Sequence, residues 1–329
     1  MAAATTTSSL GRRTKIIWFW QSNLNPFNDK EQKEWKRYSD FENDFIEEAF
    51  QRKEKVVQLN EYVINFNYNL QFKKDDKSKQ RPIKREESNS NDLVRQERFS
   101  YPERAVKSFS TSTRSPFCDE WTQISGSVRD DLSSVINHAA QGIIKEGELL
   151  NEGFDAQVMA NRLRKCTSYQ EVAECAARLY SAESFLYKVL NAAMRNNDRS
   201  KLETLGPFCW LLNWHVVQRD WEIDQIVYRG ASLTQEMIEE YRQCTGDRIT
   251  WTAFSSSSKN RHLAEQFGNT LFIINFPENY LFKKDISSIS NYPDEQEVLI
   301  KAGHSFIIDN VEFDSNTGKH LIYLSGIAV

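Results

Sequence analysis

The chain has 329 residues, of which 40% are hydrophobic and 27% charged, so it can build the cores of one or two ordinary globular domains. Its formal net charge of −4 provides no basic field that would attract nucleic acids or membrane surfaces, and we expect neither as a direct partner. No apolar run reaches the length of about 20 residues that a membrane-spanning helix needs.

Residues 1–15 are rich in Ala, Thr and Ser and contain no apolar run typical of secretory signals. We expect a disordered tail here and an intracellular protein, located in the cytoplasm or the nucleus.

Residues 16–87 have the pattern of a small half-barrel of strands around one helix. The segment opens with an aromatic, β-favouring run, and Phe45, Ala49 and Phe50 share one side of a predicted helix. Short alternating stretches predict strands at 56–59, 62–66, 69–72 and 81–85.

Aromatic and basic residues recur at fixed spacings through this segment. They are Trp18-x-Trp20, Trp35-x-x-Tyr38, the helix Phe-Ile-Glu-Glu-Ala-Phe at 45–50, Tyr62-x-Ile64-x-Phe66, Gln71 and Arg81-x-Ile83-Lys84-Arg85. The pattern resembles a WWE domain over nearly its whole length.

The resemblance implies a ligand, iso-ADP-ribose, the internal unit of poly(ADP-ribose). It puts Trp20 and Tyr62 at positions that contact adenine, and Gln71 and Arg81 at positions that hold ribose and phosphate. A stacking ring and a guanidinium fork suit such a ligand. The expected partners are therefore poly(ADP-ribose) or ADP-ribosylated proteins. The alternative is that the two aromatic residues only fill the core of a protein-binding module.

Residues 88–118 shift to Ser, Asn, Thr, Arg and Glu without periodicity, which predicts a flexible linker. It would let one domain act at a site that the other selects.

Residues 119–329 change from helical to strand patterns and form the second predicted domain. Helical stretches lie at 130–145, 151–165, 171–196 and 205–217, and shorter ones at 234–243 and 260–267. Strand candidates lie at 225–229, 249–254, 271–276, 297–302, 306–311 and 320–323. The fold class is α+β.

Five cysteines, at 118, 166, 175, 209 and 244, are odd in number and lack metal-type spacing. We expect free thiols in a reducing compartment rather than a disulfide framework. Four of the five histidines, at 215, 262, 304 and 320, have no ligand spacing either, and we expect no metal site.

Three short motifs at the ends of predicted strands contain the candidate catalytic and substrate-binding residues. Arg229-Gly230 ends one strand, the serine run 255–258 ends the next, and Glu295-Gln296-Glu297 leads into a third. Because residues two apart in a strand share a face, Glu295 and Glu297 are expected to face one cleft.

In this order the motifs resemble those of the arginine-specific mono-ADP-ribosyltransferases. Leu179-Tyr180-Ser181-x-Glu183 and Leu190-Asn191-x-x-Met194-Arg195 resemble that family's helical subdomain, and the likeness covers most of residues 125–327. It implies a helical subdomain plus two packed β-sheets around a cleft for NAD, the co-substrate.

The resemblance also implies roles. NAD loses nicotinamide through an oxocarbenium-like cation, which the Glu297 carboxylate would stabilise. Arg229 would bind the pyrophosphate or ribose, and Gly230 would let the backbone approach the ligand. Ser256 would orient Glu297, with Ser255 and Ser258 as supporting candidates.

Glu295 meets a separate need. The guanidinium of an acceptor arginine is protonated at neutral pH, and a second carboxylate can hold it and accept its proton. Family members with this Glu-x-Glu pattern modify arginine, so protein arginines are the expected acceptors.

Each motif has a plain structural alternative. Arg229 could end its strand in a salt bridge, the serines could cap a helix before Asn260, and the glutamates could face solvent. Two other functions also stay open: an NAD glycohydrolase, with water as the acceptor, and an inactive transferase fold that serves as a binding scaffold.

Overall fold

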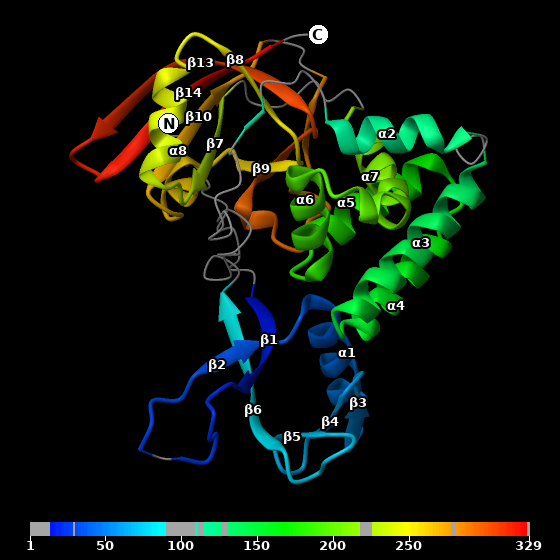
Figure 1. The fold of residues 1–329 in the computed structure, drawn as a ribbon. Helices are drawn as coiled ribbons and strands as arrows, with labels where there is room; N and C mark the ends of the chain where they lie inside the picture. The colour runs from blue at the N-terminus through cyan, green and yellow to red at the C-terminus, as the bar shows by residue number, and fades with distance from the viewer. Residues whose placement is uncertain are drawn as a thin grey trace, which may run out of the picture. The chain divides into compact units, whose positions relative to one another are not determined.

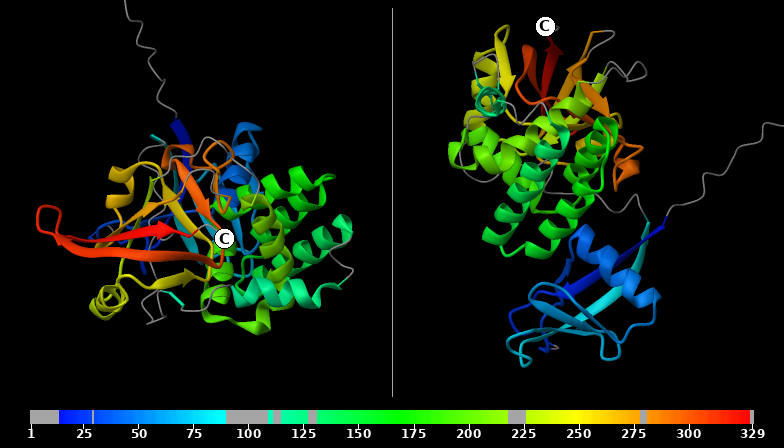
Figure 2. Two further views of the ribbon diagram at one scale, coloured as in Figure 1. Left: turned by 90° about the horizontal axis from the view of Figure 1, so that it is seen from above. Right: turned by 90° about the vertical axis from the view of Figure 1, so that its right-hand side faces the viewer.

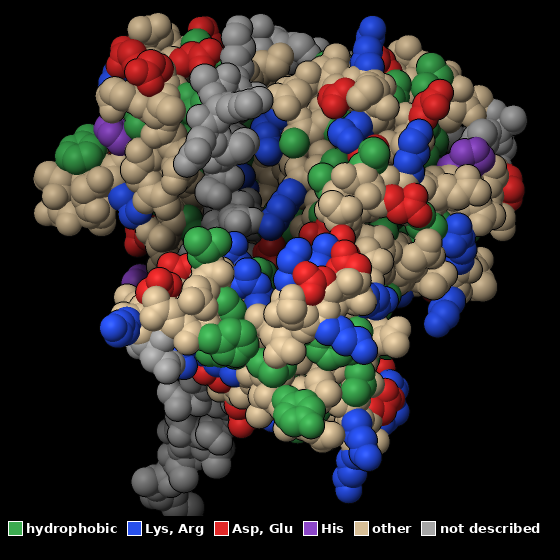
Figure 3. Space-filling view, turned by 60° about the horizontal axis from the view of Figure 1, so that its bottom comes forward, with side chains coloured by type: hydrophobic (Ala, Val, Ile, Leu, Met, Phe, Trp, Pro, Cys, Tyr) green, Lys and Arg blue, Asp and Glu red, His purple; other side chains and the backbone are tan. Residues whose placement is uncertain are grey.

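The structure is a computed structural model that describes residues 14–28, 30–89, 109–110, 115–126, 131–217, 226–277 and 281–327. The chain divides into two compact units, residues 1–94 and 95–329 (Figure 1). On the face drawn in Figure 3, basic and acidic side chains are interspersed, in keeping with the small net charge. Within the described ranges, no helix combines the length and apolar character needed to cross a membrane.

The N-terminal unit is an antiparallel sheet of six strands in the order β2-β1-β6-β5-β4-β3, with helix α1 packed against it (Figure 2). The elements are β1 Thr14–Gln21, β2 Trp35–Arg37, α1 Asp40–Gln51, β3 Val56–Gln58, β4 Tyr62–Asn65, β5 Leu70–Lys73 and β6 Gln80–Asn89. Ile46 and Ala49 of α1 are fully buried against Trp18, Ile64 and Ile83. Burial of each large apolar side chain stabilises the unit by about 1.5–3 kcal/mol.

Helix α1 is fixed at its start and along its side. Ser39 and Glu42 form a capping box that satisfies backbone donors of the first turn. Further along, the Glu47 carboxylate accepts hydrogen bonds from Trp18 Nε1 at 2.9 Å and Arg85 Nη2 at 2.7 Å. Burial alone raises the pKa of Glu47, but hydrogen bonds led by that from Arg85 lower it to about 2. The ionised carboxylate therefore ties the helix to β1 and β6.

The second unit begins with helices. They are α2 Pro116–Ile124, α3 Leu132–Leu149, α4 Gly153–Arg164, α5 Tyr169–Ser181, α6 Phe185–Asn196, the 3₁₀ helix η4 Arg199–Lys201, and α7 Leu202–Val216. The sequence predicted a single helix over 171–196, and this is wrong. Ala182 takes an extended conformation with ψ 148°, and Ser184 Oγ accepts from Leu186 N at 3.3 Å to cap α6. Both helices bury one apolar face with the same period, so periodicity did not reveal the break.

Two helices of this unit are joined covalently. Cys118 in α2 and Cys209 in α7 form a disulfide, with Cα atoms 6.5 Å apart. The expectation of five free thiols is therefore wrong for this pair, whereas Cys166, Cys175 and Cys244 are free. The paired cysteines are 91 residues apart in the sequence, and only the packing of α2 on α7 brings them together.

The strands of the second unit form one mixed sheet of eight, in the order β11-β12-β9-β7-β10-β14-β13-β8. The elements are β7 Ile226–Ala231, α8 Gln235–Gln243, β8 Arg248–Trp251, β9 Ser255–Ser258, α9 Arg261–Glu265, β10 Thr270–Asn275, β11 Lys283–Asp285, the 3₁₀ helix η5 Pro293–Glu295, β12 Glu297–Ile300, β13 His304–Asp314 and β14 Lys319–Gly326. Helices followed by a sheet confirm the α+β class. The two separate sheets expected from the sequence are joined into a single hydrogen-bonded series.

The serine run is itself a strand. The sequence predicted a strand over 249–254 that ends in serines, but β8 stops at Trp251 and the serines form β9 in another part of the sheet. Serine has little preference for strands, so propensity did not predict β9. The run is not a helix cap either, because Asn260 caps α9 by accepting a hydrogen bond from Leu263 N at 3.2 Å.

Part of the predicted linker belongs to the second unit. Phe109 is buried, and its ring centroid lies 4.7 Å from that of Tyr241. Ser110 exchanges two backbone hydrogen bonds of 2.8 Å with Thr250 on the edge strand β8. Residues 90–108 and 111–114 of the linker, like residues 1–13 of the predicted tail, lie outside the described residues.

Candidate active site

Three neighbouring strands hold the three motifs. In the sheet order, β12 lies beside β9 and β9 beside β7. Glu297 stands opposite Ser258 and Leu299 opposite Ser256, while Tyr228 of β7 is also opposite Ser258. Motifs that are up to 68 residues apart in the chain (229 to 297) thus meet in one region of the sheet.

Arg229 bridges two of these strands. It is 6% exposed, and its Nη1 donates to the backbone oxygen of Ser256 at 2.5 Å. Its guanidinium carbon also lies 6.0 Å from the ring of Trp251. The ladder between β7 and β9 contains one residue pair, Tyr228 with Ser258, so the guanidinium links the strands where their backbones part.

The serines of β9 differ in their bonds. Ser258 Oγ donates to Glu295 O at 2.7 Å and accepts from Asn260 N at 2.9 Å. Ser257 Oγ donates to Val298 O at 2.7 Å, and Ser255 Oγ to Ala253 O at 3.4 Å. Ser258 therefore fixes the loop that leads to β12.

The register defines which serines share a face with Glu297. Directly opposed residues of an antiparallel pair lie on the same face, and so do residues two apart in one strand. Ser258 is thus directly opposite Glu297, and Ser256 is diagonal to it, about 7–8 Å away between Cα atoms. Of the three predicted serines, Ser256, which was expected to orient Glu297, and Ser258, a supporting candidate, therefore share its face, whereas Ser255, the other supporting candidate, lies on the opposite face.

The two glutamates belong to different elements. Glu297 is fully buried and starts β12, whereas Glu295, 3% exposed, ends the 3₁₀ helix η5. Between them Gln296 has a left-handed backbone, φ 46°, which costs a residue with a side chain about 1–2 kcal/mol. Strand alternation therefore does not extend to Glu295, contrary to the argument from the sequence. Strained residues of this kind often occur at functional sites.

In the N-terminal unit, the predicted ligand residues fall into two sets. Tyr62 and Arg81 line a cavity of about 360 Å³, together with Leu24, Phe27 and Lys73.

Trp20 and Gln71 are not among that cavity's lining residues. Gln71 is 3% exposed, and its Oε1 accepts from Tyr38 OH at 2.6 Å. Arg81 lies over the Trp20 ring at 5.5 Å, and its Nη1 donates to the backbone oxygens of Gln21 at 2.9 Å and Asn23 at 2.7 Å.

The sequence of residues 152–328, more than half of the chain, matches the family described as NAD:arginine ADP-ribosyltransferase. The chain belongs to this family. Residues 16–85 match the WWE domain family. We therefore use the names transferase unit and WWE unit below.

The chain has relatives in other organisms, two of which follow. It is 37% identical over 99 residues to Mav of Mycobacterium avium (strain 104), which is named for NAD(+)–arginine ADP-ribosyltransferase activity; the match covers 29% of this chain and 11% of Mav. It is 28% identical over 145 residues to ecto-ADP-ribosyltransferase 5 of Rattus norvegicus, covering 41% of this chain and 45% of that one. The chain thus spans less than half of the length of both relatives.

Among solved structures, ADP-ribosyltransferase HopU1 of Pseudomonas syringae pv. Tomato DC3000 is 20% identical with a TM-score of 0.43, covering 61% of this chain and 97% of that one. The toxin Plx2a of Paenibacillus larvae is 14% identical with a TM-score of 0.42, covering 57% and 96%.

Asn191 of α6 is a polar residue of the transferase unit to which the sequence assigned no role in the site. Its Nδ2 donates to Tyr180 OH at 2.8 Å, and Tyr180 packs on Phe254 just before β9, with ring centroids 5.7 Å apart. Its Oδ1 is buried with no hydrogen-bond partner among the described residues. The sequence signal that could have drawn attention to Asn191 is a single amide side chain among the apolar residues of α6.

Gly230 of the transferase unit has a structural reason to lack a side chain. A Cβ there would lie 2.1 Å from Ala264 O and 2.7 Å from Phe267 Cβ, so α9 packs directly on this glycine. We expect Gly230→Ala to destabilise the transferase unit by about 1–3 kcal/mol, measured by urea unfolding. An unchanged unfolding midpoint with weakened NAD binding would instead assign the glycine to the substrate, as the sequence suggested.

Proposed function

We propose that the chain transfers ADP-ribose from NAD to arginine side chains of proteins and releases nicotinamide. The observation that carries the proposal is the adjacency of β7, β9 and β12, three neighbouring strands that carry Arg229, Ser256 and Glu297, with Glu295 just ahead of β12. Family membership supports the same chemistry.

The residue types suit the stages of the reaction. A buried carboxylate interacts more strongly with a ribosyl cation than one in water, and Glu297 is fully buried. Arg229 provides a fork for the pyrophosphate or ribose. In this structure that fork contacts Ser256 O. None of the four predicted catalytic residues is more than 6% exposed: Arg229, Ser256, Glu295 and Glu297. Binding of NAD therefore requires neighbouring side chains to part.

Labelled NAD with agmatine, an arginine analogue, tests the proposal. We expect nicotinamide release together with ADP-ribosyl-agmatine. Release of free ADP-ribose alone, at all agmatine concentrations, would favour an NAD glycohydrolase. If no nicotinamide is released, we would conclude that the chain is an inactive transferase fold that serves as a binding scaffold. A cell lysate in place of agmatine then identifies protein acceptors.

We further propose that the WWE unit binds iso-ADP-ribose and directs the transferase unit to poly(ADP-ribose). The cavity beside Tyr62 and Arg81 supports this, because it combines a ring with a cation. The Arg81 contacts to Gln21 O and Asn23 O would hold the guanidinium in place for a phosphate.

Titration calorimetry of the full chain tests this. We expect Tyr62→Ala to weaken iso-ADP-ribose binding about tenfold or more, because stacking of a base on an aromatic ring contributes about 1–3 kcal/mol. Tyr68→Ala is the matched control, since Tyr68 is 73% exposed and does not line the cavity. Equal affinities of the two variants, or no heat with the unmodified chain, would contradict the proposal.

A further inference from the structure

The start of β12 carries Glu297 and directly follows a strained residue. Gln296 has φ 46°, and a residue with a side chain keeps such a backbone only where its surroundings hold it. The Glu297 carboxylate can stabilise a ribosyl cation only if this junction keeps it beside the reacting carbon. A displacement of about 1 Å can lower a reaction rate about 10²-fold. The contacts that hold the junction therefore bear directly on the proposed chemistry.

Main-chain hydrogen bonds hold the junction from both sides. Ile286 N, just after β11, donates to Glu297 O at 3.0 Å, and Lys259 N, just after β9, donates to Gln296 O at 3.1 Å. In the sheet, β11 and β9 are the two neighbours of β12. Each flanking strand thus binds one residue of the junction, and the position of the junction depends on how these two strand ends are spaced.

A side-chain ion pair fixes that spacing. Lys259 Nζ donates to Oδ2 of Asp285, the last residue of β11, at 2.6 Å. Because β12 lies between β9 and β11, and neighbouring strands are about 4.8 Å apart, the two side chains span roughly 9–10 Å across β12. Asp285 stands opposite Val298, so its side chain lies on the face of β12 opposite to that of Glu297. The pair can therefore hold the strand without standing beside the Glu297 carboxylate.

The carboxylate of this pair is ionised and fixed in orientation. Burial alone would raise the pKa of Asp285, but the hydrogen bond from Lys259 and then those from Ser287 lower it. Ser287 N donates to Asp285 Oδ1 at 2.8 Å, which leaves Oδ2 for Lys259. The side chains of Lys259 and Asp285 are 26% and 22% exposed, so solvent screens this pair less than it screens a fully exposed one.

We propose that Lys259 and Asp285 are positioning residues of the transfer reaction: their ion pair fixes the start of β12 and keeps the Glu297 carboxylate where the ribosyl cation forms. This role rests on the proposed function. In it neither residue contacts NAD, and both act through the backbone of Gln296 and Glu297.

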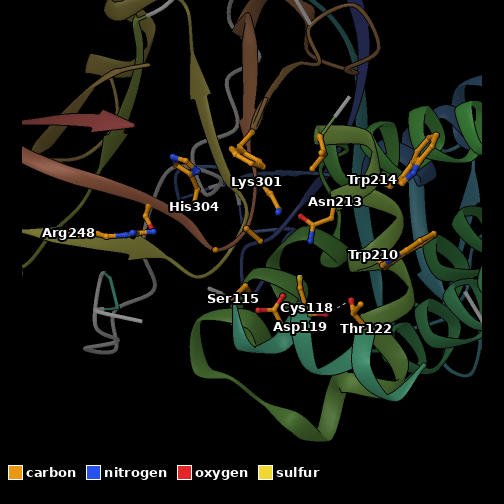
Figure 4. Close-up of a pocket in the computed structure, with 15 residues that line it drawn as sticks. Ser115, Cys118, Asp119, Thr122, Trp210, Asn213, Trp214, Arg248, Lys301 and His304 are labelled. Carbon is orange, nitrogen blue, oxygen red and sulfur yellow. Dashed lines mark hydrogen bonds between the residues drawn. The ribbon is translucent and has the colours of Figure 1, made fainter. Parts of the chain in front are cut away.

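The other end of β12 offers a matched control. Lys301 directly follows the strand, four residues after Glu297 and so roughly 13 Å along it. Its side chain extends towards Asn213 in a cavity of about 480 Å³ that is lined in part by α2 and α7 (Figure 4). None of the four predicted catalytic residues, all of them described, lines that cavity. Lys301→Met therefore repeats the substitution Lys259→Met beside the same strand, but away from the junction.

Steady-state kinetics of nicotinamide release by the full chain, with agmatine as the acceptor, test the proposal. We expect Lys259→Met and Asp285→Asn each to lower kcat about tenfold and to leave the KM for NAD within about twofold, because positioning of Glu297 acts in the transition state. Lys259→Arg, which can keep the ion pair, should retain about half of kcat or more. The double variant should lose about tenfold rather than a hundredfold, since each residue acts through the other. Lys301→Met should leave kcat within about twofold.

The same measurements separate this role from others. If Lys259 bound the NAD pyrophosphate directly, Lys259→Met would raise KM and Asp285→Asn would not, and the proposal would be overturned. Multiplied losses in the double variant, or full kcat in both single variants, would overturn it as well. No nicotinamide release from the unmodified chain would overturn the proposed function, and this role with it. Rates are measured at a temperature at which circular dichroism shows each variant fully folded; if Lys259→Met does not fold, Asp285→Asn decides.

Discussion

Replacement of Glu297 by Gln is expected to abolish NAD consumption, both by transfer to agmatine and by hydrolysis. Both reactions pass through the same ribosyl cation, and the amide removes the charge that stabilises it. One preorganised electrostatic group typically contributes 10²–10³-fold in rate, and a full charge in a buried site contributes at least that much, so we expect a loss of roughly 10³-fold or more. Release of labelled nicotinamide measures it.

The structure offers a matched control for this experiment. Asp294 is exposed and lies in the same short 3₁₀ helix as Glu295, so Asp294→Asn makes the same carboxylate-to-amide change three residues away. It should leave nicotinamide release within about twofold. Glu297 and Gln are nearly equal in size, so β12 should keep its register. If Glu297→Gln retained a tenth of the original rate, the proposed role of the carboxylate would be wrong.

The order of the motifs could be predicted from the sequence, but their contacts could not. Arg229 and the serine run each follow a short apolar stretch, and Glu297 begins one. Such a pattern can be recognised from neighbouring residues in the sequence alone. The bond from Arg229 Nη1 to Ser256 O depends on how β7 and β9 diverge, which is set by the whole sheet. The disulfide of Cys118 likewise depends on packing between helices far apart in the chain.

The errors of the sequence prediction have physical causes. The break between α5 and α6 spans three residues and leaves the apolar period unchanged. Strand β9 consists of serines, whose low strand propensity is overridden by pairing with β12. Strand alternation failed at Glu295 because Gln296 adopts a left-handed backbone, which no propensity predicts for glutamine.

Replacement of Glu295 by Gln is expected to reduce transfer to agmatine by about 10²-fold or more while hydrolysis of NAD continues. A positioned general base contributes about 10²–10⁴-fold, and only the acceptor guanidinium needs this one, because it must lose a proton as its bond to ribose forms. When water is the acceptor, Glu297 still stabilises the cation, and Glu295 is not needed as a base for the acceptor. The ratio of ADP-ribosyl-agmatine to free ADP-ribose, measured with labelled NAD, should therefore fall about as much as transfer does.

The position of Glu295 makes this separation possible. Its backbone oxygen accepts from Ser258 Oγ at 2.7 Å, so the loop is held by main-chain contacts that the substitution leaves in place. Because Glu295 lies outside β12, a change in its side chain should not shift Glu297. Asp294→Asn again serves as the control and should preserve the product ratio. Equal losses of transfer and hydrolysis in Glu295→Gln would show that the two carboxylates act together in breaking the bond to nicotinamide, and that the acceptor is held by other residues.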